Sequence, residues 1–200
     1  MPFPELPRLP FSHDRKTRRN LGYHGLMATA TRLTLREFRI AYADRKPHYE
    51  YWFGEARQKA MPTWLHGLLQ AILCEFLMRA GYRAGSEIEL RIDPEWEPVP
   101  DVVGALTIEL PYPTHPVDIV IEVLSPTDSA SDVLDKCRQY ARIGIRKILV
   151  ADPQRMEGWE WVEEQQRLQH VEAFDLPNQQ SILLTDVWAR LRQEMQRGSR

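Results

Sequence analysis

The stretch that decides the fold is Asp118-Ile119-Val120-Ile121-Glu122-Val123-Leu124, followed by the turn Ser125-Pro126-Thr127-Asp128. Its continuous β-branched content predicts a central strand that is covered on both faces. After the turn, apolar residues recur at helical spacing over residues 129–143, and Gly144 ends the pattern. Residues 145–150 are predicted to form the next strand, so this part of the chain is predicted to run strand, helix, strand.

The flanking sequence extends this pattern on both sides. Upstream lie a helix after Thr63, an alternating strand over residues 87–92 and a strand over 102–106. A short helix opening at residues 33–38 and a hairpin over 48–58 precede them. Downstream we expect strands over 158–162 and 167–173 and a helix over 185–195. The predicted class is α/β (α+β): a mixed four-stranded core sheet flanked by helices, with an extra N-terminal β hairpin.

Composition limits the class of protein. At roughly 150 residues per domain, a chain of 200 residues is expected to form one domain. Its 26 Lys+Arg against 28 Asp+Glu give a net charge of −2. This balance excludes a uniformly basic nucleic-acid coat but not a local basic patch. No apolar run approaches the ~20 residues of a membrane span, and no secretory pattern opens the chain. We therefore expect a cytoplasmic protein without a membrane partner, with Cys74 and Cys137 as buried thiols.

The two ends differ from the centre. Residues 1–25 contain four prolines and five basic residues without a consistent period, which predicts a flexible arm. The arm is either a solvated tail or a phosphate-contacting segment. Residues 26–196 are predicted to form a single domain, and residues 197–200 a polar tail.

Two carboxylates do not fit a purely structural account. Glu122 lies inside the most hydrophobic strand, where a carboxylate is not buried unless it is paired or bound to a cation. If the preceding strand pairs with it in antiparallel fashion, Leu106 falls near Asp118, and Asp101 lies alongside Glu122 or Val123. Neighbouring carboxylates repel each other unless positive charge lies between them. A divalent ion with oxygen ligands, such as Mg²⁺, meets that need.

A lysine on the following helix can reach the same place. Asp132, Lys136 and Tyr140 are spaced four residues apart and share one side of that helix. Because the connection packs the helix back against the sheet, the Lys136 ammonium can extend toward Asp101 and Glu122. Such a charge can orient an attacking water or stabilise charge that develops on a phosphate.

These residues carry a family resemblance. Pro100-Asp101, followed by Glu122-Val123-Leu124 on the next strand, resembles the PD-(D/E)XK nuclease superfamily. More closely, residues 33–162 resemble the Uma family of restriction-endonuclease-like proteins, and the run from Asp118 to Tyr140 is the most specific part. The resemblance implies a restriction-endonuclease-like core and a Mg²⁺ site, with Mn²⁺ as a possible substitute. Its metal ligands fall here on Asp101, Glu122 and the backbone carbonyl of Val123.

The chain departs from the superfamily at the lysine. The superfamily usually carries it two residues after the glutamate, where this chain has Leu124. The family resembled here moves it to the following helix, at Lys136. We expect Lys136→Ala to reduce activity with little loss of stability.

Structural alternatives stand beside each assignment. Asp101 can simply cap a turn after its proline, and Asp118 reads as an edge-of-strand charge. His66, one position off the apolar stripe of its helix, is either a hydrogen-bonded boundary residue or an active-site group. Tyr140 is either packed or catalytic.

Two classes of function follow. The first is a Mg²⁺-dependent endonuclease that hydrolyses phosphodiester bonds in DNA, with Asp101, Glu122 and Lys136 as catalytic residues and His66 and Tyr140 as further candidates. The second is a catalytically inactive nuclease-fold protein that binds nucleic acid or another protein. Pairing of two active sites in a homodimer is a further expectation.

Overall fold

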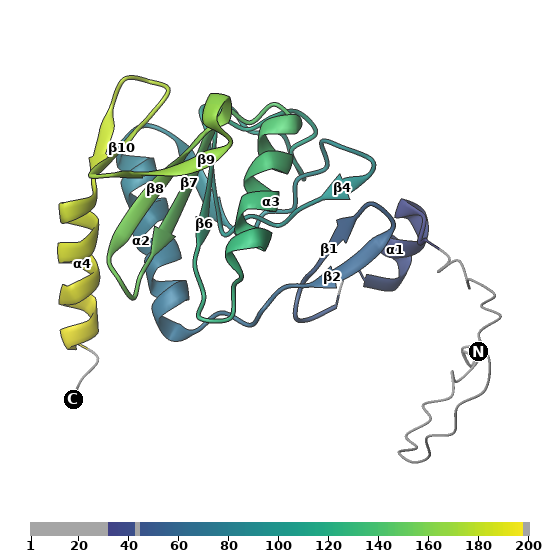
Figure 1. The fold of residues 1–200 in the computed structure, drawn as a ribbon, viewed down its shortest axis with the longest axis horizontal. Helices are drawn as coiled ribbons and strands as arrows, with labels where there is room; N and C mark the ends of the chain where they lie inside the picture. The colour runs from purple at the N-terminus through teal and green to yellow at the C-terminus, as the bar shows by residue number, and fades with distance from the viewer. Residues whose placement is uncertain (1–31, 43–44, 198–200) are drawn as a thin grey trace, which may run out of the picture. The chain divides into compact units, whose positions relative to one another are not determined.

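The residues described, 32–42 and 45–197, are built around a six-stranded mixed sheet in this computed structural model (Figure 1). Its strands, in spatial order, are β3 (Arg83–Ser86), β5 (Val102–Ala105), β6 (Ile119–Val123), β7 (Lys147–Asp152), β8 (Glu157–Val162) and β9 (Arg167–Val171). Only β6 and β7 run parallel, and the other neighbouring pairs are antiparallel. The mixed sheet predicted from the sequence is confirmed.

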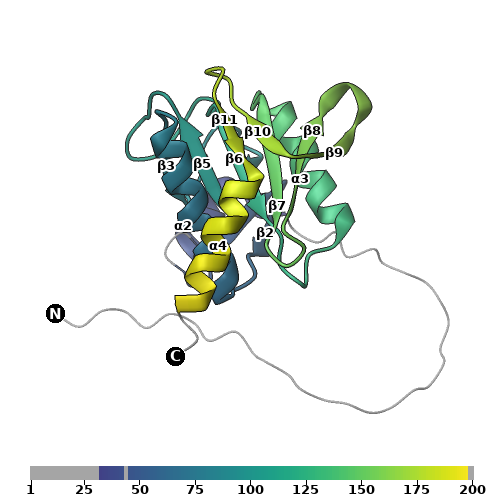
Figure 2. The same ribbon diagram turned by 90° about the vertical axis from the view of Figure 1, so that its left-hand side faces the viewer.

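The strand β6 lies inside the sheet, and all five of its residues are buried. Ile119, Ile121 and Val123 pack on one face with α2 (Trp64–Arg79) and α4 (Leu184–Arg197). The opposite face, which carries Val120, packs against α3 (Ala130–Arg142). Figure 2 shows α2 and α4 in front of the sheet and α3 behind it. This two-sided covering explains the continuous apolar character of the strand.

The helices begin and end where their capping residues indicate. The Thr63 hydroxyl accepts a hydrogen bond from the first turn of α2, and Ser129 does the same for α3. Gly81 and Gly144, just beyond the two helices, have φ of 88° and 89°, a left-handed conformation that favours glycine.

A smaller sheet contains the predicted N-terminal hairpin. Its strands, in the order β2-β1-β4, are β2 (Glu55–Gln58), β1 (Tyr49–Trp52) and β4 (Trp96–Glu97). The helix α1 (Leu35–Tyr42) packs on this sheet, with the Phe38 ring 5.2 Å from that of Tyr51. Thr34 and Glu37 cap α1 reciprocally: the Glu37 amide donates to Thr34 Oγ1 at 3.2 Å and the Thr34 amide to Glu37 Oε2 at 2.8 Å.

The predicted strand over residues 87–92 is wrong. The strand in this region is β3, which ends at Ser86 because Glu87 adopts a φ of 54° and turns the chain out of the sheet. The alternation of polar and apolar residues that suggested a strand still places Leu90 in the core, where it is fully buried. Its amide donates to the carbonyl of Pro98 at 2.9 Å rather than joining the sheet.

The sheet also has six strands rather than four. The strands β8 and β9 continue it beyond β7, so β8 is an inner strand and β9 forms the edge. The remaining elements are the 3-10 turn η1 (Glu163–Gln165) and the hairpin of β10 (Ala173–Asp175) and β11 (Ser181–Leu183) that leads into α4.

The predicted arm over residues 1–25 lies outside the described residues, and the domain boundaries stay a prediction. Both cysteines, Cys74 and Cys137, are buried and free, as expected. In the part of the chain that the structure describes, no helix is long and apolar enough to cross a membrane.

Candidate active site

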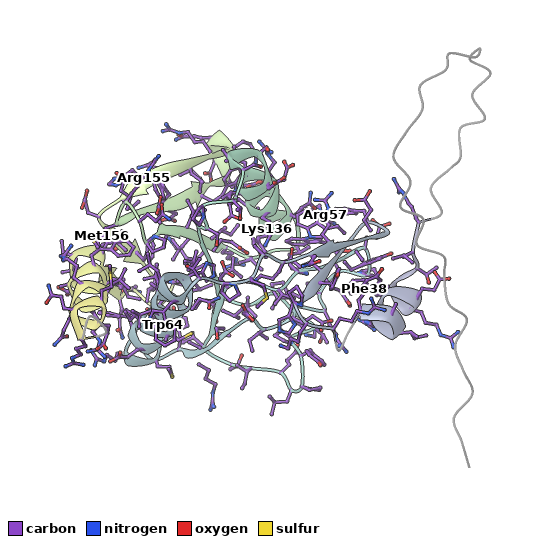
Figure 3. The ribbon with its side chains drawn as sticks, turned by 90° about the horizontal axis from the view of Figure 1, so that it is seen from below. Phe38, Arg57, Trp64, Lys136, Arg155 and Met156 are labelled. Atoms are coloured by element: carbon purple, nitrogen blue, oxygen red, sulfur yellow. The ribbon has the colours of Figure 1, made fainter. Side chains whose placement is uncertain are left out.

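A pocket of about 430 Å³ opens at the end of the sheet where β5 begins and β6 ends. Its wall combines the hairpin, the start of α2, the end of β6 and the first half of α3. The charged or titratable side chains that line it are Glu50, Arg57, Lys59, His66, Glu87, Asp101, Glu122, Asp128, Asp132 and Lys136. In Figure 3, Lys136 lies between the α3 ribbon and the hairpin that carries Arg57.

Asp101 is buried and held by four donors. Its Oδ1 lies 2.8 Å from Lys59 Nζ, 3.3 Å from His66 Nε2 and 3.4 Å from Gln70 Nε2. Its Oδ2 accepts from the Val123 amide at 2.8 Å. This last bond confirms the predicted register, in which Asp101 lies beside the end of β6. The Asp101 side chain therefore does more than cap a turn.

Glu122 shares Lys136 with a second buried carboxylate. Lys136 Nζ lies 3.2 Å from Glu122 Oε2 and 3.1 Å from Glu50 Oε1. The Tyr140 hydroxyl donates to the other oxygen of Glu122. Glu50 in turn accepts from the Val99 amide at 3.0 Å. The lysine therefore joins α3 to both β1 and β6.

The charges of the site set each other's pKa values. Burial raises the pKa of Glu122 to about 6, although Lys136 acts against this shift. Burial opposes the charge of Lys136, but the carboxylates of Glu122 and Glu50 hold its pKa above the ordinary value. Burial also opposes the charge of Asp101, yet the hydrogen bond from His66 and the charge of Lys59 hold its pKa below the usual range. Asp101 and Lys136 are thus charged at neutral pH.

The two further candidates differ in their access to the pocket. His66 is buried and lines the wall, where its Nδ1 lies 3.1 Å from Ser125 Oγ. Tyr140 is fully buried against Trp96, with 4.9 Å between ring centroids, and it is not part of the pocket wall. Tyr140 is therefore packed and reaches the site only through its hydrogen bond to Glu122.

Sequence reasoning missed Glu50 and Lys59. A carboxylate within the aromatic run Tyr49–Phe53 was a possible signal, because β1 buries three successive residues and so is covered on both faces. Lys59 gave no signal, since its partner Asp101 lies 42 positions away. Lys59 and Lys136 thus place positive charge against Asp101 and Glu122.

The oxygen donors present still suit such an ion. Among the residues described, no three His, Cys, Asp or Glu side chains form a metal-binding group. An ion would then be held by the carboxylates of Asp101 and Glu122, the Val123 carbonyl and water. Mg²⁺ commonly takes one or two carboxylates and keeps several waters. The raised pKa of Glu122 also leaves this carboxylate in need of more positive charge.

Comparisons with known proteins identify the family of the chain. The model of the Uma2 family, described as "Putative restriction endonuclease", matches residues 35–192. The chain belongs to the Uma2 family. The matched segment runs from α1 into α4 and includes every site residue named above. The Uma2 assignment confirms the resemblance seen in the sequence.

A solved structure shares the fold of this Uma2 chain. It is described as a putative nuclease belonging to DUF820 from Anabaena variabilis ATCC 29413, with 21% identity and a TM-score of 0.62. The match covers 80% of this chain and 99% of that one. No curated protein matches this chain.

Proposed function

We propose that this chain is a Mg²⁺-dependent endonuclease that hydrolyses phosphodiester bonds in DNA. The observation that carries the proposal is the convergence of Asp101, Glu122 and Lys136 on one pocket, in a chain of a restriction-endonuclease-like family. These residues come from three separate elements, and packing alone does not require two carboxylates and a lysine to be buried together.

Asp101 and Lys136 have different roles in the proposed reaction. Asp101 is fixed as a carboxylate by Lys59, His66 and the Val123 amide. Lys136 keeps its charge and is held by two carboxylates, so its ammonium is preorganised to stabilise negative charge on a phosphate. Because the ammonium is already in position, little reorganisation energy is needed when the reaction occurs.

Asp101, Glu122 and the Val123 carbonyl would hold the ion, with Mn²⁺ as a substitute for Mg²⁺. When bound, such an ion polarises the phosphate and lowers the pKa of a coordinated water. The carboxylate of Glu122, with its pKa of about 6, is available to it as an anion at neutral pH. We further propose that two copies pair, so that two sites cut the two DNA strands.

A digestion experiment tests this function. Supercoiled, linear duplex and single-stranded DNA are each incubated with the purified protein in EDTA, Mg²⁺ or Mn²⁺. We expect cleavage only with metal, and a rate loss on the order of 10²–10³-fold or more for Glu122→Gln. Glu172→Gln, a change at a glutamate whose side chain is 85% exposed, should cleave normally. Absence of cleavage by the wild type under every condition would reject the nuclease proposal.

One observation favours the non-catalytic alternative. Asp101 and Glu122 each have a lysine partner already, Lys59 and Lys136, so both carboxylates are paired with a cation before any metal binds. In that case the pocket would bind nucleic acid or a protein without cutting it. Calorimetry with Mn²⁺ separates the two functions: the nuclease binds the ion and loses it on Glu122→Gln, whereas the binding module takes up none.

A further inference from the structure

A second groove adjoins the pocket. Its volume is about 700 Å³, and it lies between the start of α3 and the strands β7, β8 and β9. The two cavities share Ser125 and Asp128, which belong to the turn after β6. The two cavities therefore meet at this turn.

Trp159 lines this groove and lies in the same cross-strand row as Glu122. The sheet register places Glu122 beside Val150, Val150 beside Trp159, and Trp159 beside His170. These residues form one row across β6, β7, β8 and β9 on the same face of the sheet. Two strand spacings of about 4.8 Å separate Glu122 from Trp159, so the indole lies on the order of 10 Å from the site. The His170 ring backs the indole edge-on, with 6.0 Å between centroids.

Two arginines and two aspartates line the groove, and Arg155 Nε lies 3.9 Å from Asp152 Oδ2. Arg155 and Arg167 line it, and the Arg155 side chain is 74% exposed. The acids in the same wall are engaged locally: Asp128 accepts from the Ser125 amide at 2.7 Å, and Asp152 from the Gln154 amide at 2.8 Å. Both arginines are exposed and so available to backbone phosphates, and the half-buried indole of Trp159, which packs against the core, lines the same groove.

We infer that this groove, which we call the flank groove (Trp159, Arg155 and Arg167), binds the single-stranded nucleic acid next to the bond that is cut. The inference rests on the proposed nuclease function and names its substrate class. A base within a duplex already stacks on its neighbours, so only an unstacked base is free to stack on Trp159. Stacking on aromatic side chains, combined with a cationic path for the backbone, is how sequence-tolerant single-strand binding works.

Binding without metal tests the inference apart from cleavage. A fluorescein-labelled oligothymidylate of about twelve residues is titrated in EDTA and followed by anisotropy, with a duplex of equal length alongside. We expect the wild type to prefer the single strand. Trp159→Ala should weaken this binding by about tenfold or more, and Trp159→Phe by less, because phenylalanine retains a stacking face.

Arginine variants supply the matched control and guard against misfolding at Trp159. Arg155→Glu, at an exposed position, should weaken binding and reduce its dependence on salt. Arg146→Ala removes another exposed cation, which precedes β7 at the opposite end of that strand from the site, and should bind as the wild type does.

The outcomes separate the two claims. Equal binding by wild type, Trp159→Ala and Arg155→Glu, or equal affinity for duplex and single strand, overturns the flank groove even if the protein cleaves DNA. Binding that depends on Trp159 and Arg155 supports the groove. If no DNA is cleaved with any metal while that dependence holds, the nuclease function fails and the flank groove stands only as a binding site for single-stranded nucleic acid.

Discussion

At the scale of single residues, Asp101 and Glu122 are both buried carboxylates but meet opposite conditions. Asp101 is surrounded by donors, which stabilise its anion. Glu122 receives Lys136 and Tyr140 yet lies deep enough that burial dominates. The two acids should therefore respond differently to substitution and to pH.

Asp101→Ala is expected to destabilise the fold. It leaves the Lys59 ammonium, His66, Gln70 and the Val123 amide without their common acceptor, at a cost of about 3–5 kcal/mol of unfolding free energy. Asp118→Ala, which removes an acceptor for one backbone amide at the protein surface, should cost only about 1 kcal/mol. Urea denaturation measures both values, and equal losses would contradict this account of Asp101.

The raised pKa of Glu122 predicts that the free energy of unfolding depends on pH. Its pKa of about 6 in the folded protein exceeds the ordinary value of 4.5 for a glutamate, so between these values the folded state binds more protons than the unfolded state. Its contribution to stability therefore falls as pH rises from below 4.5 to above 6, by about 2 kcal/mol. Relative to wild type, Glu122→Gln should gain that amount over this window in urea denaturation. A difference independent of pH would refute the raised pKa.

At the scale of elements, the hairpin contributes to the site as well as to the fold. The strand β1 carries Glu50, which is buried and touches Lys136 on α3 across 86 positions of sequence. The loop after β2 carries Lys59, which holds both Asp101 and the Val99 carbonyl. The added hairpin thus closes one side of the pocket.

Glu50→Gln tests whether the hairpin positions Lys136. The change preserves shape but weakens the hold on the ammonium, so we expect the turnover number to fall by about tenfold with KM and Mn²⁺ affinity nearly unchanged. Glu55→Gln, on β2 with a side chain that is 66% exposed, is the control and should behave as wild type. An equal decline in both variants, or a change only in KM, would argue against a positioning role.

Elements with a clear local signal could be predicted from the sequence. The position of Thr63, the helical spacing over residues 129–143 and the apolar run of β6 predicted three elements correctly. The predicted register then placed Asp101 and Glu122 beside each other. The strand β3 was missed because the next residues, Glu87–Ile92, alternate between polar and apolar as strands do. The left-handed φ of Glu87 turns these residues out of the sheet. The roles of Glu50 and Lys59 depend on tertiary contacts that no local pattern encodes.

At the scale of the whole molecule, the remaining question is whether two copies act together. The larger sheet ends in the edge strands β3 and β9, and the smaller one ends in β2, so both offer edges for a second copy. We expect sedimentation equilibrium at micromolar concentration to give twice the monomer mass of 23.4 kDa. A strict monomer at high micromolar concentration would reject pairing without affecting the site.

Lys136 tests the central claim, that this site is built to hydrolyse a phosphodiester. The structure revises the expectation that its removal costs little stability, because Lys136→Ala leaves Glu50 and Glu122 buried without their shared cation. Lys136→Arg keeps the charge but not the compact ammonium, and so separates stability from chemistry.

The decisive measurement is the single-turnover rate of DNA cleavage in saturating Mg²⁺ by wild type, Lys136→Arg and Lys136→Ala, each confirmed to be folded at the assay temperature. We expect the alanine variant to lose on the order of 10²-fold or more, the arginine variant to recover only part of the rate, and both to retain Mn²⁺ binding. Cleavage by Lys136→Ala at the wild-type rate would contradict the account.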